Sequence, residues 1–141
     1  MKIEQQFVTY EIALKLKELG FNEPLHCFDE TFWYINGNIS LCNDEYKELF
    51  PEKEYVIAPL YQQTIQWFMD NCKLYITINP YNDEELFQTL YYFEITDKDF
   101  NVIEDYTYYH SYRECLDAAI LEAIELTIEE SSTNIASTTE M

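Results

Sequence analysis

The chain has 141 residues, 27 of them acidic and eight basic, and its formal net charge is −19 at pH 7. It also contains 13 Tyr, 9 Phe and 2 Trp, which is more aromatic residues than a disordered acidic segment carries. We therefore expect a folded protein with an acidic surface. Because phosphate backbones and anionic lipid head groups are held by clustered Lys and Arg, we expect neither direct nucleic-acid binding nor membrane binding.

The sequence predicts a cytosolic protein with one domain. Its apolar runs are only a few residues long, far below the roughly 20 residues of a membrane span. Residues 1–6 lack the apolar core of a secretory signal. We expect one compact domain over residues 1–129 and a flexible tail over residues 130–141, where Ser, Thr and Asn become frequent.

The cysteines are expected to be buried thiols. Their spacing is wide and irregular, and a cytosolic chain of this size does not need disulfides. The four positions are Cys27, Cys42, Cys72 and Cys115.

The first predicted element is a helix over residues 10–19. Thr9 is a good N-cap residue, and apolar residues follow it at helical spacing. Gly20 supplies a left-handed stop, after which Phe21 is expected to fold back on Leu16.

A hairpin is predicted next, because residues 25–42 are rich in aromatic and β-branched types around Asn36-Gly37. Asn-Gly is the strongest short hairpin signal, since both residues tolerate the positive φ of a tight turn. The acidic segment 43–56 is expected to be a surface loop with one helical turn before Pro51.

The second half of the chain predicts a helix followed by three strands. Pro59 suits the first position of a helix, which we expect to run to about residue 71. Strand-like stretches follow at residues 74–79, 87–96 and 102–109. The inward residues of the middle stretch are expected to be Tyr91, Phe93 and Ile95.

A last helix is predicted to start after Ser111 and to end near residue 129. Ser111 and Glu114 fit a capping box, and a broad apolar stripe follows. The whole pattern predicts an α+β fold in which an antiparallel sheet of about three to five strands is packed by helices, in the order α-β-β-α-β-β-β-α.

Asp97, Asp99 and Asn101 match the opening of an EF-hand calcium loop. Val102 then stands where the loop needs glycine, and Tyr108 stands where it needs a bidentate glutamate. An acidic turn explains the same residues without a metal. Zinc sites pair their ligands at short spacing, and the chain has no such pair, so we predict neither a metal nor another cofactor.

No catalytic motif is present. Cys115 near the start of the last helix, with His110 close in sequence, fits the outline of a Cys–His nucleophile. Cys115 also falls on the apolar stripe, where a cysteine behaves as a small hydrophobic residue, and we favour that interpretation. The two glycines exclude a phosphate-binding loop.

Tyrosines are concentrated in the second half of the chain, and strand alternation directs some of them away from the core. Exposed tyrosine beside acid is a composition suited to protein interfaces. An outer sheet face that is simply aromatic, or that is covered by the first helix, stays open as the alternative. The candidate partner surface consists of Asp97, Asp99, Glu104, Asp105, Tyr106 and Tyr108.

The predicted order over residues 59–129 is similar to that of a double-stranded RNA-binding domain. That family grips phosphates with a lysine-rich start of its last helix. Here residues 111–117 hold one basic residue, Arg113, beside two acids. The resemblance therefore implies the architecture and not RNA binding.

Three segments resemble small acidic proteins of Bacteroides-type bacteria and of their phages and mobile elements. The segments are residues 10–21, residues 57–68 and residues 112–126. The resemblance spans most of residues 7–129. It implies a small accessory protein acting in a bacterial cytoplasm, and it transfers no functional residue.

We expect a non-enzymatic protein that binds a basic, for example nucleic-acid-binding, protein through its acidic and tyrosine-bearing surface. Such a protein would occupy a nucleic-acid groove in place of the nucleic acid. The alternatives are a small enzyme or ligand-binding domain with a site of tyrosines and carboxylates, and a phage assembly component.

Overall fold

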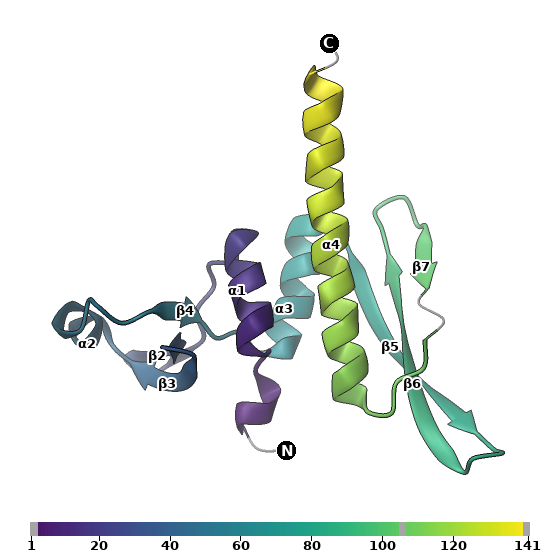
Figure 1. Ribbon diagram of the computed structural model, residues 1–141, viewed down its shortest axis with the longest axis horizontal. Coiled ribbons are helices and arrows are strands. Elements are labelled where there is room, and N and C mark those ends of the chain that lie inside the picture. The colour runs from purple at the N-terminus through teal and green to yellow at the C-terminus, as the bar shows by residue number, and fades with distance from the viewer. Residues whose placement is uncertain (1–2, 105–106, 140–141) are drawn as a thin grey trace. The chain divides into compact units, whose positions relative to one another are not determined.

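A computed structural model describes residues 3–104 and 107–139 and has an α+β fold, as the sequence predicts (Figure 1). The strands are divided between two antiparallel sheets, one of four strands and one of three, rather than gathered in a single sheet. The chain forms two compact units, residues 1–64 and residues 65–141. The prediction that residues 1–129 form one domain depends on how these two units associate, and it stays a prediction.

The first unit contains the four-stranded sheet and three helical segments. In chain order its elements are η1 (Ile3–Gln6), α1 (Tyr10–Glu18), β1 (His26–Cys27), β2 (Glu30–Ile35), β3 (Asn38–Cys42), α2 (Asp44–Leu49) and β4 (Tyr55–Ile57), followed by the start of α3 (Tyr61–Trp67). Strand β2 is central and pairs with β1, β3 and β4. Tyr34 and Phe32 lie on one face of β2, where the hydroxyl of the buried Tyr34 donates to the Val8 carbonyl and Phe32 contacts Phe7.

Helix α1 has the boundaries that its cap residues predict. The Thr9 hydroxyl accepts the Ile12 amide at 3.3 Å and so satisfies one of the unpaired donors of the first turn. At the other end Gly20 adopts φ +95°, and the Phe21 amide donates to the Leu16 carbonyl at 3.0 Å. The predicted return of Phe21 toward Leu16 is confirmed.

The Asn36-Gly37 hairpin is also confirmed, with φ values of 49° and 86°. Asn36 exchanges two hydrogen bonds of 2.9 Å with Glu54, one through its backbone and one through its side chain. These bonds hold the next segment in place as β4. The prediction of a surface loop over residues 43–56 is therefore wrong in part, since it contains α2, capped by the Asn43 side chain, and the start of β4.

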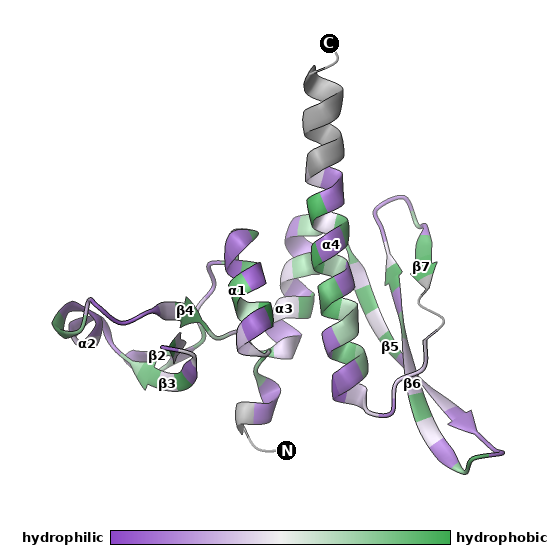
Figure 2. Cartoon of the chain, viewed as in Figure 1, coloured by the Kyte–Doolittle hydropathy of each residue, from purple (hydrophilic) through white to green (hydrophobic). Residues whose placement is uncertain are grey.

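The second unit contains the three-stranded sheet with α4 against one face (Figure 1). After α3 come the π-helical turn η2 (Phe68–Cys72), β5 (Tyr75–Asp83), β6 (Gln88–Thr96), β7 (Val102–Glu104) and α4 (Tyr112–Thr139), and the sheet order is β5-β6-β7. Hydrophobic and hydrophilic residues alternate along these elements (Figure 2). Phe93 and Ile95 of β6 and Ile120 and Ile124 of α4 are buried.

Helix α4 starts as predicted, because the Ser111 hydroxyl accepts the Glu114 amide at 3.1 Å. The helix continues to Thr139, past the predicted end near residue 129. The flexibility of residues 130–141 stays a prediction. Within residues 3–104 and 107–139, every helix is too short or too polar to traverse a lipid bilayer.

Candidate functional site

Three tyrosines gather on the face of the β5-β6-β7 sheet that points away from α4. Phe93 is buried toward α4, so its neighbour Tyr92 points to the opposite face. The register places Tyr81 on that same face, and Tyr108 packs against both rings, with centroids 4.9 Å from Tyr81 and 6.0 Å from Tyr92. We call Tyr81, Tyr92 and Tyr108 the outer tyrosine cluster.

The outer tyrosine cluster is open to solvent. Tyr81 has 45% and Tyr108 47% of its surface exposed, and Tyr92, which contacts Tyr108, is half-buried. The cluster therefore offers rigid, amphipathic rings whose mutual contacts already limit their motion. Such rings lose little conformational entropy when a partner covers them.

The tyrosine next in sequence points the other way. Tyr109 and Tyr91 donate their backbone amides to each other's carbonyls, at 2.8 and 2.9 Å, and this bridge fixes the direction of both side chains. Tyr109 stacks on the buried Phe93 at 6.3 Å between centroids, and Tyr91 meets Tyr112 edge-on at 5.9 Å. The prediction that Tyr91, Phe93 and Ile95 face inward is confirmed.

Asp97 organises the turn between β6 and β7. One oxygen of its carboxylate accepts the backbone amides of Asp99 and Asn101, both at 2.9 Å. The amide of Asn101 is the main reason that the pKa of Asp97 lies below its ordinary value. The carboxylate is thus engaged by the turn, which explains the EF-hand-like sequence without a metal.

The other predicted surface residues lie in the β6–β7 turn, at the end of β7 and after it. Asp99 is exposed in the β6–β7 turn, and Glu104 ends β7 in register with Glu94. Asp105 and Tyr106 lie outside the described residues. Of the predicted set, the structure places Tyr108 in the outer tyrosine cluster, while Asp97 and Asp99 belong to the turn.

The β5–β6 hairpin has an apolar tip that was not predicted from the sequence. Leu86 is 63% and Phe87 93% exposed, directly after the acidic run 83–85. The Asp83 carboxylate accepts the amides of Glu85 and Leu86 at 3.0 and 3.2 Å, which shapes the tip. Two large apolar residues inside a turn were the signal for this feature, because turns ordinarily carry polar residues.

Negative charge is concentrated in the same unit. Residues 65–141 contain sixteen acidic and three basic side chains, a formal charge of −13, whereas residues 1–64 contain eleven and five, a charge of −6. The outer tyrosine cluster and the hairpin tip therefore belong to the more acidic part of the chain. A field of this sign accelerates encounter with basic surfaces.

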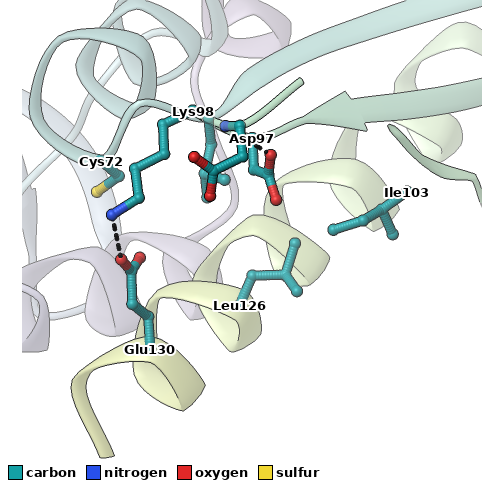
Figure 3. A pocket seen from close by; sticks show the side chains of 8 residues that line it. Cys72, Asp97, Lys98, Ile103, Leu126 and Glu130 are labelled. Atoms are coloured by element: carbon teal, nitrogen blue, oxygen red, sulfur yellow. Dashed lines mark hydrogen bonds and ion pairs between the residues drawn. The ribbon is translucent and has the colours of Figure 1, made fainter. Parts of the chain in front are cut away.

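A cavity of about 250 Å³ lies beside the β6–β7 turn (Figure 3). Lys98 and Glu130 meet across it at 3.8 Å, and Cys72 lines its wall. Burial is the main reason that the pKa of the Cys72 thiol is raised, which disfavours the nucleophilic thiolate. Asp97, which also lines the cavity, is engaged by the amides of its turn.

The described residues contain no group of three His, Cys, Asp or Glu side chains arranged to hold a metal ion. All four cysteines are thiols, as predicted, but only Cys42 and Cys115 are buried, whereas Cys27 and Cys72 are partly exposed. Cys115 is fully buried within the apolar stripe of α4, in agreement with its interpretation as a small hydrophobic residue. His110 is exposed.

Comparison of the chain with protein-family models, with curated proteins and with solved structures gives no significant match.

Proposed function

We propose that the protein is a non-enzymatic accessory binding protein that engages a basic protein partner. The contact surface consists of the outer tyrosine cluster and the tip of the β5–β6 hairpin. The resemblance of residues 10–21, 57–68 and 112–126 to proteins of Bacteroides-type bacteria and their phages favours a phage or mobile-element origin and action in the bacterial cytoplasm.

The observation that carries this proposal is the packing of Tyr108 against Tyr81 and Tyr92, with the side chains of Tyr81 and Tyr108 exposed. Aromatic residues on a protein surface are typical anchors of protein interfaces. The formal charge of −13 on residues 65–141 selects a basic partner. Nucleic-acid-binding grooves are basic because they hold phosphates with clustered Lys and Arg, so we propose that the protein competes with nucleic acid for such a groove.

The proposal is tested by capture from a bacterial lysate with purified wild-type protein and with the double variant Tyr81→Ser/Tyr108→Ser. Leu49→Ser is the matched control, because Leu49 is 74% exposed but belongs to α2. We expect a basic protein that the wild type and the control retain and that the double variant loses.

Two further conditions sharpen the test. Raising the salt concentration should release the captured protein, because charge attraction between exposed groups is screened within about 8 Å at physiological ionic strength. Added duplex DNA should also displace it. A captured protein that is acidic, or that the double variant retains equally, would contradict the proposal.

A further inference from the structure

The first unit contains a separate cavity between α1 and the four-stranded sheet. Its volume is about 160 Å³. It is lined by Ala13, Lys17, Phe21, Asn22, Trp33, Tyr55 and Ile57. An apolar cavity of about 150 Å³ has room for one benzene ring. The volume therefore fits a ligand with a single aromatic ring.

Aromatic and aliphatic side chains form the walls of this cavity. The register pairs Trp33 with Ile57 and Ile35 with Tyr55, so Trp33, Tyr55 and Ile57 project from the same face of the sheet. The rings of Trp33 and Tyr55 meet edge-on, with centroids 6.3 Å apart and planes at 87°. A planar ring placed against them gains favourable aromatic contacts.

Contacts outside the cavity hold these walls in place. The Trp33 indole N–H donates to the Thr31 hydroxyl. The Lys47 ammonium lies 3.8 Å from the Trp33 ring centroid and 5.3 Å from that of Tyr55, and Lys47 does not line the cavity. Because both rings are already oriented, a ligand would bind without first ordering them.

One side of the cavity is cationic and polar. Lys17 lies one helical turn after Ala13 on α1, is exposed, and forms no ion pair with any residue that the structure describes. Asn22, just beyond the end of α1, adds an amide donor. Lysine and amide N–H groups together suit a carboxylate.

We propose that this cavity binds a small aromatic carboxylate with one ring. The ring would lie against Trp33, Tyr55 and Ile57, and the carboxylate would lie beside Lys17 and Asn22. The proposal is independent of the proposed partner surface, since every lining residue belongs to the first unit. That unit carries a charge of −6, no acidic residue is among those that line the cavity, and the repulsion from acidic groups outside it is screened at physiological ionic strength.

The test is an NMR titration of the full chain with benzoate, followed through the indole N–H signal of Trp33. The chain has two tryptophans, so the variant Trp67→Phe assigns that signal. Benzamide and benzylamine are the neutral and cationic comparison ligands. We expect saturable shifts of the Trp33 signal with benzoate, weaker binding of benzamide, and the weakest binding of benzylamine.

Lys17→Met should weaken benzoate binding by about fivefold, the upper range for an exposed ion pair, and should leave benzamide binding unchanged. Lys15→Met is the matched control, because Lys15 lies on the same helix but does not line the cavity. Ala13→Leu should fill the cavity and abolish binding of all three ligands.

Two results would overturn the proposal. One is the absence of any Trp33 shift with benzoate at millimolar concentration. The other is equal binding of benzoate by the wild type and by Lys17→Met, because the carboxylate would then not be recognised at the proposed place. Neither result bears on the capture experiment above, so the two proposals fail separately.

Discussion

Tyr108 packs against Tyr81 with ring centroids 4.9 Å apart, and this contact joins the segment after β7 to the long β5–β6 hairpin. Both residues are nearly half exposed, so their contact excludes little water. The contact orients the two rings, because each ring restricts the motion of the other. The tyrosine part of the proposed partner surface is thus ordered before a partner binds.

The buried face of α4 should be the main source of stability in the second unit. Ile124 is 1% exposed, and we expect Ile124→Ala to lower the free energy of unfolding by about 2–5 kcal/mol. Ile128, on the same helix and 44% exposed, is the matched control, and Ile128→Ala should change it by less than about 0.5 kcal/mol. Urea unfolding measures both, and equal effects of the two variants would show that α4 does not pack as described.

Replacing Phe100 by asparagine should stabilise the protein. Phe100 adopts φ +65° in the β6–β7 turn while its ring is 86% exposed, so it bears backbone strain with little burial in return. Asparagine tolerates this conformation, and we expect Phe100→Asn to gain about 0.5–1 kcal/mol. Phe100→Ala removes the ring but keeps the strain. If the two variants unfold at the same urea concentration, the explanation by backbone strain is wrong.

Asp97 should make the stability of its turn depend on pH. The backbone amides that bind its carboxylate lower its folded pKa below the ordinary 3.8. The stabilisation is therefore complete above that ordinary value and is lost as the pH falls through the lower, folded pKa. Asp97→Asn keeps an oxygen acceptor that does not titrate, so its melting temperature should fall less than that of the wild type in acid. Parallel melting curves of the two proteins from neutral to acidic pH would contradict this assignment.

Lys47 should hold α2 against the sheet through its contact with Trp33. At 3.8 Å from the ring centroid, this cation–π interaction is expected to contribute about 0.5–1 kcal/mol. Lys47→Met should lose that stability, and Lys47→Arg should keep most of it. Urea unfolding followed by tryptophan fluorescence measures the difference. An equal loss of stability in Lys15→Met would mean that removing any positive charge lowers the stability, and that the contact with the Trp33 ring is not responsible.

The features that could be predicted from the sequence are those that depend on near neighbours. The helix caps at Thr9 and Ser111 and the turn at Asn36-Gly37 each depend on a few neighbouring residues. The alternation of apolar and polar residues around Phe93 likewise shows which side of the strand faces inward. Strand β4 could not be predicted, because it depends on hydrogen bonds between Asn36 and Glu54. The division into two sheets likewise depends on pairings between strands far apart in the sequence.

The candidate site shows the same distinction. The sequence predicts a strand over residues 102–109 and names Tyr108 as a candidate surface residue, whereas β7 ends at Glu104 and Tyr108 lies exposed in the segment after it. Its contact with Tyr81 needs the register between β5 and β6 and the return of the chain after β7. The cavity beside Trp33 could not be foreseen, because α1 and β4 are distant in sequence and neither forms it alone.

The uneven distribution of charge gives the two units different responses to salt. Like charges within residues 65–141 repel one another, and this repulsion opposes the compact state of that unit. Dissolved cations screen this repulsion, so added salt should raise the free energy of unfolding of this unit. A basic protein bound at the outer tyrosine cluster would neutralise this negative charge more completely than salt does. Partner binding and resistance to unfolding would then increase together in residues 65–141, while residues 1–64 would change less.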